Sequence, residues 1–574
     1  MQTAQVSRAT WSVRARDPEA EARLEERLGI GHILARALVA RGLADVPEAA
    51  KFLKPTLSDL HDPKLLPDYA AAQDVLLDAR DRKLPIFVHG DYDVDGVTSA
   101  ALLTRYLENI GCVVTTHVPH RQREGYGIHA MAVEYARASG AQVFLTCDCG
   151  TAAIAQVELA KSHGMRVVVT DHHEVGDSLP NAEAVINPHR PDSTYPFTEL
   201  SGVGVAFKLC LGLTRELGMP ESGYTRAFAD LAALGTIADV MPLVDENRII
   251  ARFGLDVLPG TKKLGLQALM RQIGMAPGAP VRSWDVGFRI GPRLNAAGRV
   301  DDARTSLDLL LTTDIAVAQR LAEAVDTNNQ ARRETQLRIL EEAEAMIEAD
   351  PDGISMFLVV ASEGWHSGIV GIVAGRLAER YNRPTLVAGI DPESGLCKGS
   401  ARSVFGFNLA EAIHAFPDLM QGGGHAAAAG CSFAVDQLPA VREALAGYAR
   451  AHLTDEDLVP HIVADLAVEL DELTLSSVSE LSELEPMGRA NSEPLFSTSS
   501  AYLESARATR DGKHLQMTWR GESGTRLDGI GFGMGDRLAD LQPGQSYQLL
   551  FEAKVEEWQG REKVKLTIRD YRPA

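Results

Sequence analysis

Carboxylates and imidazoles follow the ends of apolar runs at four places along this 574-residue chain. Hard oxygen ligands with a few imidazoles suit divalent cations such as Mn²⁺ and Mg²⁺. Two such cations about 4 Å apart can hydrolyse a phosphodiester, because one holds the attacking hydroxide and the other the leaving oxygen. We therefore expect a metal-dependent phosphoesterase. The residues concerned are His89, Asp91, Asp93 and Asp95, then Asp148, then Asp171, His172 and His173, and finally Asp239.

The densest of these groups is the stretch 89–96, in which Asp91, Asp93 and Asp95 alternate. Anions on one side of an extended segment repel one another unless cations lie between them. Taken alone, the stretch fits a solvated acidic loop better than a metal site. Its recurrence with three other groups favours metal. The adjacent histidines at 172 and 173 can divide two roles, one binding metal and the other orienting it or donating to a phosphate.

The apolar runs before these groups predict buried strands over 84–88, 142–146 and 165–170, and the periodicity of 97–109 predicts an amphipathic helix. This alternation is typical of a doubly wound parallel sheet in an α/β fold. Ligands of such sheets collect at the carboxyl ends of the strands. The separate segments should therefore bring Asp93, Asp95, Asp148 and His172 to one rim.

The second half of the chain predicts further domains. Residues 314–350 are rich in Ala, Glu, Leu, Arg and Gln, which predicts a long connecting helix with a break near Asn328 and Asn329. A strand over 355–361 and a helix over 368–380 predict a smaller α/β domain. From about residue 458 the pattern becomes short alternating segments, which predict a small β-barrel.

Composition limits the classes of function. The formal net charge of −21 argues against non-specific coating of nucleic acid, which relies on many Lys and Arg contacts, so any polyanion must be bound locally. The chain has no long uncharged apolar run and no basic-then-apolar leader, so we expect neither a membrane span nor a signal peptide. Six cysteines without a CxxC pair or a spaced framework fit a reducing compartment. We expect a cytoplasmic enzyme.

Four stretches resemble the motifs of the DHH phosphoesterase superfamily, namely HGDYDVDG at 89–96, TCDCGT at 146–151, DHH at 171–173 and ALGTIADVMPL at 233–243. Others resemble the RecJ branch and its DHH-associated domain, namely PHRQREGYG from 119, FRIGPRLNAAGRVDDA from 288, GWHSGIVGIVAGRL from 364, GSARS from 399 and GGGH from 422. The resemblance covers nearly the whole chain. The C-terminal segment resembles the nucleotide-binding OB-type barrel of the same branch.

The resemblance implies a 5′→3′ exonuclease on single-stranded DNA that uses two Mn²⁺ or Mg²⁺ ions, releases 5′-mononucleotides and acts in DNA repair and recombination. Asp148 is then the bridging carboxylate, with Asp91 and His173 as catalytic helpers. The implied metal ligands are His89, Asp93, Asp95, Asp148, His172 and Asp239. The implied substrate-binding residues are Arg121, Tyr126, Arg293, Arg299, His366, Ser400, Arg402, Gly423, Gly424 and His425.

Residue types support part of this list. Arg402 beside Ser400 offers a fork and a hydroxyl that suit a phosphate, and Arg121 near Tyr126 offers a charge beside a stacking face. A surface salt bridge is the alternative for both arginines, and a structural role is the alternative for Arg293 and Arg299. The glycine run before His425 can approach a phosphate closely or form a flexible turn. The C-terminal segment interleaves basic and aromatic residues that suit either a single-strand groove or a barrel core with solvated faces, namely Lys513, His514, Trp519, Trp558, Arg561, Lys563 and Lys565.

We expect five parts: an N-terminal helical segment packing on the core (1–75), the DHH domain (76–313), the connecting helix (314–352), the DHH-associated domain (353–457) and the OB-like nucleic-acid-binding domain (458–574). No further partner-binding domain is expected after Tyr571. The expected partners are single-stranded DNA with a 5′ end, a single-strand-binding protein and a helicase, and we expect a monomer.

Two other functions stay open. One is a phosphodiesterase of the same superfamily acting on cyclic dinucleotides or short oligonucleotides; such chains are generally smaller and lack the C-terminal barrel. The other is a non-catalytic replication scaffold of the same fold, which should have lost metal ligands.

Overall fold

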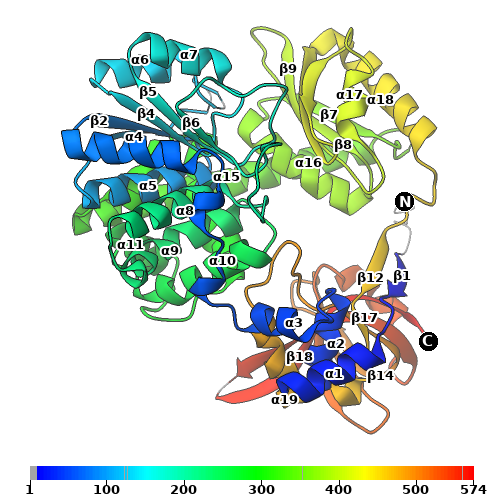
Figure 1. Ribbon diagram of the computed structural model, residues 1–574. Helices are drawn as coiled ribbons and strands as arrows, with labels where there is room; N and C mark the ends of the chain where they lie inside the picture. Colours follow the sequence, from blue (N-terminus) through cyan, green and yellow to red (C-terminus); the bar gives the residue numbers. More distant parts are fainter. Residues whose placement is uncertain (1–8, 122, 126, 352, 559) are drawn as a thin grey trace. The chain divides into compact units, whose positions relative to one another are not determined.

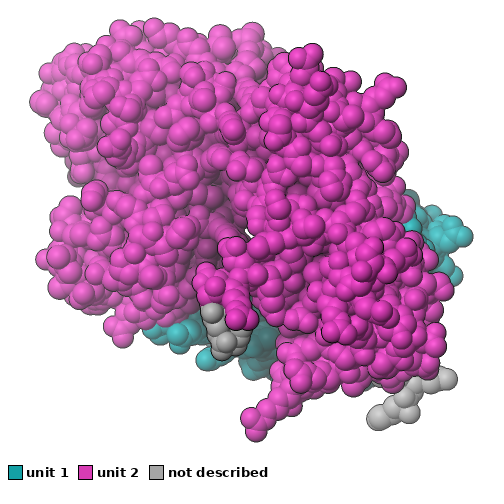
Figure 2. All heavy atoms as spheres, turned by 90° about the horizontal axis from the view of Figure 1, so that it is seen from below, with its two compact units in different colours: residues 1–11, 299–301, 327–462 teal, residues 12–298, 302–326, 463–574 magenta. Residues whose placement is uncertain are grey.

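The computed structural model describes residues 9–121, 123–125, 127–351, 353–558 and 560–574. The chain divides into two compact units, coloured separately in Figure 2. We call residues 12–298, 302–326 and 463–574 the large unit, and residues 1–11, 299–301 and 327–462 the small unit. Among the described residues, no helix is both long enough and apolar enough to cross a membrane.

A sheet of five parallel strands forms the centre of the large unit, in the order β3-β2-β4-β5-β6. The first strand of the sheet, β2, has β3 on one side and β4 on the other, so the chain changes direction between β2 and β4. At such a switch point the loops diverge and leave a crevice at the carboxyl ends of the strands. The strands are β2 (Pro85–Gly90), β3 (Val113–His117), β4 (Val143–Cys147), β5 (Arg166–Thr170) and β6 (Ala184–Ile186).

Helices cover both faces of this sheet (Figure 1), as the doubly wound prediction requires. Because side chains alternate along a strand, Phe87 and Phe144 pack against α6 and α7, whereas Val88 and Leu145 pack against α4, α5 and α8. The helices are α4 (Tyr69–Arg82), α5 (Val94–Asn109), α6 (Ala130–Ala138), α7 (Ile154–Ser162) and α8 (Gly202–Glu216).

A helical layer continues the larger core beyond α8. Its members contribute buried residues such as Leu231, Ile250 and Leu269 to the same cluster as the sheet. The elements are α9 (Glu221–Ala238), α10 (Asp245–Val257), α11 (Leu264–Gln272), α12 (Ser283–Asp285), a π-helical turn (Val286–Ile290), α13 (Gly291–Val300) and α14 (Arg304–Leu311).

The long helix α15 spans Ile315–Glu348 without interruption, so the predicted break at Asn328 and Asn329 is wrong. Asparagine has only a modestly unfavourable helix propensity, which tertiary contacts readily override. Here Asn328 donates to Asp301 Oδ2 at 3.2 Å, and Asn329 is buried.

The small unit contains a mixed sheet in the order β10-β11-β9-β8-β7. Helix α16 and the second half of α15 pack on one face, and α17 and α18 pack on the other. The strands are β7 (Leu358–Glu363), β8 (Thr385–Ile390), β9 (Leu396–Arg402), β10 (Gln421–Gly424) and β11 (Ala428–Ala434), and the helices are α16 (Ser367–Tyr381), α17 (Leu409–His414) and α18 (Leu438–His452).

Five strands near the C-terminus close into a barrel in the order β14-β15-β16-β18-β17, with β14 pairing β17 and β16 parallel to β18. This is the connectivity of an OB fold. The predicted alternation is confirmed, since Leu549 and Phe551 point into the core. The five barrel strands are β14 (Phe496–Ala508), β15 (Leu515–Arg520), β16 (Arg526–Gly531), β17 (Ser546–Trp558) and β18 (Arg561–Pro573). A short strand, β13 (Leu466–Ala467), pairs in parallel with β14, and the helix α19 (Leu475–Glu480) lies between these two strands in the sequence.

The N-terminal helices belong to the same hydrophobic core as this barrel. Leu24, Ile33 and Leu34 are fully buried in a cluster with Trp519 and Phe551. The barrel is therefore completed by residues from the other end of the chain. The N-terminal elements are β1 (Thr10–Val13), which pairs β12 (His461–Ala464), α1 (Pro18–Leu28), α2 (His32–Ala40) and α3 (Val46–Leu53).

Candidate metal centre

The four groups of metal-type residues meet at the carboxyl edge of the parallel sheet, beside the switch point between β2 and β4. Asp93 caps the N-terminus of α5, Asp148 directly follows β4, and His172 lies two residues after β5. Asp239 comes from outside the sheet, at the C-terminus of α9. The sequence prediction that separate segments reach one rim is thus realised in the fold.

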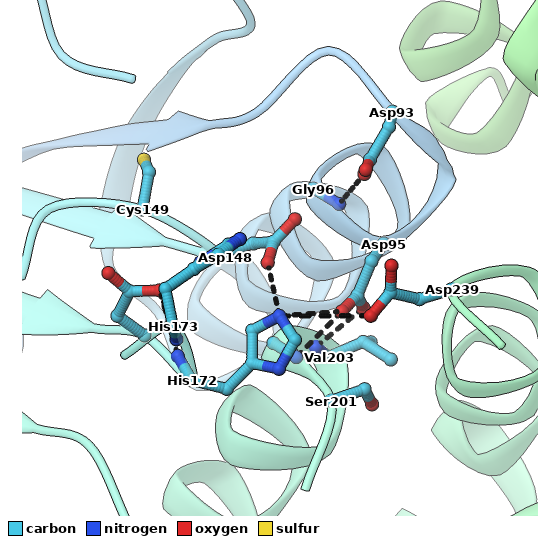
Figure 3. A network of polar contacts seen from close by, with 12 residues as sticks. Asp93, Asp95, Gly96, Asp148, Cys149, His172, His173, Ser201, Val203 and Asp239 are labelled. Atoms are coloured by element: carbon cyan, nitrogen blue, oxygen red, sulfur yellow. Dashed lines mark hydrogen bonds and ion pairs between the residues drawn. The ribbon is translucent and has the colours of Figure 1, made fainter. Parts of the chain in front are cut away.

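His172 lies at the centre of this cluster (Figure 3). Its Nε2 atom is 3.1 Å from Asp148 Oδ1, and 3.8 Å from one carboxylate oxygen of Asp95 and of Asp239. Three groups of residues could each hold an ion, because within each group the ligand atoms lie within 4.8 Å of one another. The groups are Asp148, His172 and His173; Asp95, His172 and Asp239; and Asp91, Asp93 and Asp148. Asp148 and His172 each belong to two groups, as residues between two cations would.

Backbone N–H groups hold the carboxylates in place. The two oxygens of Asp95 accept hydrogen bonds from Gly202 at 2.7 Å and Val203 at 2.8 Å, at the N-terminus of α8. This end of a helix dipole favours an anion. Asp93 accepts from Gly96 at 3.0 Å. A Cβ atom at Gly96 would lie 2.5 Å from the backbone of Asp91, which explains the glycine that ends the motif.

Two residues at the centre have a left-handed backbone conformation, which residues other than glycine rarely adopt. Asp148 has φ +59° and Val240, which follows Asp239, has φ +57°. Each such conformation costs about 1–3 kcal/mol, and such residues cluster at active sites. Gly202 packs against the first of them, since a Cβ there would lie 2.6 Å from Asp148 Cβ and Oδ1.

The two histidines of the DHH motif differ in their electrostatics. Burial lowers the pKa of His172 to about 4, so its imidazole is neutral and can bind metal. Although burial opposes it, the hydrogen bond and charge of Asp171 raise the pKa of His173 to about 9. Asp171 accepts from His173 Nδ1 at 2.7 Å and from the backbone of Thr151 at 2.9 Å. This difference supports the predicted division of roles between the histidines.

His89 is placed differently from the other expected ligands. It is fully buried, and its ring stacks on those of Phe144 and His117. Burial lowers its pKa to about 3. Its Nε2 lies 3.4 Å from the carbonyl of Gly127, and its Nδ1 has no hydrogen-bond partner among the described residues. A neutral imidazole that donates through one nitrogen keeps the lone pair of the other for a metal.

The carboxylates of the centre repel one another and are buried, so they suit divalent cations. Burial and repulsion by Asp93 raise the pKa of Asp95 to about 7, and burial with repulsion by Asp95 and Asp93 raises that of Asp239 to about 8. Burial also raises the pKa of Asp91 and of Asp148 well above the usual range. Asp91 Oδ1 is buried without a hydrogen-bond partner among the described residues. Bound cations would reverse this penalty, so the donor set suits Mn²⁺ or Mg²⁺.

Comparison with known proteins identifies the family. Family models match at residues 85–236 (DHH family, N-terminal domain), 353–451 (DHHA1 domain) and 464–570 (RecJ OB domain). The single-stranded-DNA-specific exonuclease RecJ of Bacillus subtilis (strain 168) is 38% identical over 98% of this chain and 71% of its own length. That of Escherichia coli (strain K12) is 33% identical over 94% and 96%. The chain belongs to the RecJ family.

Solved RecJ structures agree with this assignment. The crystal structure of RecJ in complex with Mn²⁺ from Thermus thermophilus has a TM-score of 0.84 and 31% identity, covering 99% of this chain and 80% of that one. The Mg²⁺ complex from the same organism has a TM-score of 0.79 and 30% identity, covering 99% and 79%. Both cations that the donor set suits are thus found in RecJ structures.

Of the substrate residues expected by resemblance to the RecJ branch, Arg121 lies near the metal centre. Its guanidinium is 4.7 Å from the ring centroid of Tyr92, which stands between Asp91 and Asp93. Tyr126 lies outside the described residues. Arg293 donates to Asp326 Oδ1 on α15 and to the carbonyl of Arg289, both at 2.7 Å, contacts that favour the structural alternative.

Ser400 and Arg402 lie on β9 of the small unit, beneath α16. A Cβ at Gly371 of that helix would lie 3.2 Å from Ser400 Oγ and 3.4 Å from an Arg402 nitrogen, so glycine leaves room for both. Arg402 donates to the carbonyl of Ala401 at 2.8 Å and has no carboxylate partner among the described residues. Burial lowers its pKa. A desolvated guanidinium without a carboxylate is suited to bind an anion, and the salt-bridge alternative is not realised.

Each of the other expected residues of the small unit makes a contact with the backbone. Arg299 donates to the carbonyl of Gly368 at 3.0 Å, and His366 Nδ1 accepts from the N–H of the same residue at 3.1 Å. Gly423 and Gly424 belong to β10, which pairs β11, and the backbone N–H of His425 donates to the carbonyl of Ala428 at 2.9 Å. The glycine run is therefore a paired strand and not a flexible turn.

The barrel places one of the aromatic residues of the C-terminal segment in its core and two of the basic residues in ion pairs. Trp519 is fully buried in the barrel core, so its place on a nucleic-acid surface is excluded. Its alternation with Leu515 and Met517 was the signal for this. Lys563 pairs with Asp528 at 2.7 Å and Lys565 with Glu556 at 2.8 Å.

Sequence reasoning missed residues that act on the centre from far along the chain. Gly202 and Val203 bind a carboxylate more than 100 residues away, at separations of 107 and 108. Arg489 exerts its charge on Asp239 from the segment before the barrel. None of the three carries a local pattern that would have revealed its role.

Proposed function

We propose that this chain is a single-stranded-DNA-specific exonuclease that hydrolyses phosphodiester bonds from the 5′ end and releases 5′-mononucleotides, in DNA repair and recombination. One observation carries the proposal: carboxylates and a neutral imidazole from four segments converge at the switch point of a parallel sheet. Their arrangement suits two cations, and phosphodiester hydrolysis is the reaction that such pairs catalyse. The relatives named as single-stranded-DNA-specific exonucleases support the substrate.

The proposed ligands are His89, Asp93, Asp95, Asp148, His172 and Asp239. Asp148 and His172 each belong to two of the three ligand groups, and Asp148, whose carboxylate has two oxygens, is the one that would serve both cations. When bound, the two cations supply an activated water and stabilise the leaving oxygen. His173, kept protonated by Asp171, donates to a phosphate oxygen, and Asp91 completes the acidic wall. No protein nucleophile is required.

Polarity requires recognition of a 5′ terminus. We assign this to Arg402 with Ser400, since the desolvated guanidinium has no anionic partner among the described residues. A terminal phosphate carries nearly two charges and three acceptor oxygens. A charge-assisted fork on such a group is stronger than one on an internal phosphate.

Digestion of end-labelled DNA tests the proposal. With Mn²⁺ present, a 5′-labelled single strand should yield labelled mononucleotide at once, and a 3′-labelled strand should shorten progressively. The matching duplex should be resistant. Preference for dinucleotides over a long strand would instead favour the cyclic-dinucleotide and short-oligonucleotide alternative. Absence of hydrolysis by folded, Mn²⁺-saturated protein would favour the scaffold.

The finer aspects of partnership and location also belong to this proposal. An enzyme that needs a single strand depends on a helicase to separate duplex DNA and meets the single-strand-binding protein that covers the product. The six cysteines are free and buried, which fits the reducing cytoplasm. Addition of a helicase with ATP should convert a resistant blunt duplex into a substrate; unchanged resistance, with unwinding confirmed, would argue against this coupling.

A further inference from the structure

Two large aromatic side chains are exposed side by side in the large unit. Trp284 is 58% exposed and Phe288 is 68% exposed, and their rings stack with centroids 5.6 Å apart. They lie on α12 and on the π-helical turn Val286–Ile290. Exposed apolar patches can mark binding sites, and π-helical turns are frequent at functional sites.

The pair lies close to the metal centre. Gly291 begins the helix after the π-helical turn, and a Cβ there would lie 3.3 Å from Ala238 Cβ, in the residue before Asp239. Phe288 precedes Gly291 by three residues, about 5 Å along a helix. The backbone of Phe288 is therefore on the order of 10 Å from that of Ala238, beside the centre.

A tight turn brings a cation to the same place. Gly488 and Asn491 exchange backbone hydrogen bonds of 2.8 and 3.1 Å, which leaves Arg489 at the tip. The carbonyl of Arg489 accepts from Leu243, four residues after Asp239, at 2.9 Å. The turn is also joined to the aromatic helix, because Ser283 Oγ donates to the carbonyl of Met487 at 2.6 Å.

The guanidinium of Arg489 is available for a ligand. It is exposed, and it makes no ion pair with any residue in the described part of the chain. Its charge is close enough to Asp239 to oppose the burial that raises the pKa of that carboxyl.

The neighbouring carboxylates are used internally. Glu485 accepts from the backbone of Met487 at 3.0 Å, and Asp285 pairs with Arg289 at 2.9 Å. The exposed surface therefore presents two rings and a cation. We call Trp284, Phe288 and Arg489 the shelf.

We propose that the shelf binds the single strand beside the scissile bond, with Arg489 on a backbone phosphate and the aromatic pair stacked on a base. The inference rests on the proposed function and deepens it. Aromatic faces interleaved with cations are the recognition pattern for single strands, because unpaired bases offer free π-faces that a duplex does not. The shelf thereby contributes to the selection of single over double strands.

A phosphate-by-phosphate test addresses Arg489. Strands carrying one uncharged methylphosphonate at successive linkages are compared as substrates of the wild type and of Arg489→Ala. We expect Arg489→Ala to raise KM about tenfold with little change in kcat. The slope of the logarithm of the binding constant against the logarithm of the salt concentration, here called the salt slope, should become shallower by about 0.7, the value for one neutralised single-strand phosphate. At one linkage near the 5′ end, the methylphosphonate should slow the wild type but not the variant. Equal losses in both enzymes at every linkage would overturn the contact.

Arg226→Ala is the matched control. Arg226 is an exposed arginine on α9, 13 residues before Asp239 and so roughly 20 Å away along the helix. The same charge is thus removed from the same unit, and KM should remain that of the wild type. Arg489→Lys should recover part of the affinity and of the salt slope. A control variant that weakens binding as much as Arg489→Ala would reduce the effect to net charge.

Base stacking is tested with strands that carry one abasic site. An abasic site at the stacked position should weaken wild-type binding about tenfold and leave Trp284→Ala unaffected, with Phe288→Leu as a milder second variant. Melting curves check that both variants are folded. If the wild type digests single strands and these variants match it on all strands, the shelf fails while the proposed function stands. If the wild type does not digest single strands, the proposed function itself fails.

Discussion

Replacement of Gly202 by alanine should disable the metal centre without removing any ligand. The added Cβ would lie 2.6 Å from Asp148 Cβ and Oδ1, about 0.8 Å short of ordinary van der Waals contact. Neither the backbone of Asp148 nor that of Gly202 can shift easily to relieve this contact. The backbone of Asp148 is left-handed and donates to Thr170 at 3.0 Å, while the N–H of Gly202 holds Asp95 at 2.7 Å.

The expected cost follows from this displacement. A shift of roughly 1 Å in a catalytic geometry can cost about 10²-fold in rate, or about 2.7 kcal/mol of barrier. Overpacking adds a loss of about 1–3 kcal/mol in the free energy of unfolding. We expect Gly202→Ala to be folded, with kcat on a single strand reduced about 100-fold and Mn²⁺ bound more weakly. Steady-state digestion and calorimetric Mn²⁺ titration measure these quantities.

Gly212→Ala provides the control on the same helix. A Cβ at Gly212 would collide with Tyr69 in the hydrophobic core, ten residues and so roughly 15 Å along the helix from Gly202. This variant should lose stability but keep the wild-type kcat per folded molecule. Wild-type kcat and Mn²⁺ affinity in Gly202→Ala would refute the claim that Gly202 sets the position of Asp148.

Three further outcomes are expected. Metal removal should destabilise the protein more as pH rises from about 6 to about 8.5. The pKa values of Asp95, about 7, and Asp239, about 8, are raised, so the folded metal-free protein keeps protons that the unfolded chain loses near pH 4, and its free energy of unfolding falls as pH rises. A difference in melting temperature between the Mn²⁺-bound and metal-free forms that does not change with pH would contradict this. Asp171→Asn removes the charge that keeps the pKa of His173 near 9. In a plot of hydrolysis rate against pH, the fall in rate at alkaline pH should therefore move down by about two pH units, towards the ordinary histidine pKa. An unchanged alkaline fall would exclude His173 as the donor. Arg402→Ala should cost roughly 10- to 100-fold on 5′-phosphorylated DNA, corresponding to about 1.5–3 kcal/mol, and much less on a 5′-hydroxyl strand; equal losses on both would exclude end recognition, and Arg450→Ala on α18 controls for charge.

The sheet and the segments of the metal centre could be predicted from the sequence because both obey short-range rules. Apolar runs such as 165–170 mark buried strands, and parallel strands deliver the residues that follow them to one edge. The roles within DHH could not be read in the same way. Asp171 has the residue type of a ligand, yet its oxygens are occupied by Thr151 and by the two histidines.

The residues that orient the centre escaped prediction because they act through backbone groups and distant turns. The amides of Gly202 and Val203 have no side-chain signature, and Arg489 reaches Asp239 through a turn 250 residues away in sequence. The wrong break at Asn328 has a related cause: helix propensity is a weak prior that tertiary contacts override. The core that the barrel shares with Leu24 and Ile33 likewise joins the two ends of the chain.

A count of bound Mn²⁺ by calorimetry with electron paramagnetic resonance tests most directly whether Asp148 can hold two cations at once. The wild type should bind two Mn²⁺ per chain with a spin-coupled signal. Asp148→Ala should stay folded, retain at most one tightly bound Mn²⁺ without coupling, and lose hydrolysis of single strands. The exposed Asp177→Ala is the control and should match the wild type. Two coupled Mn²⁺ ions and substantial hydrolysis in folded Asp148→Ala would contradict the account.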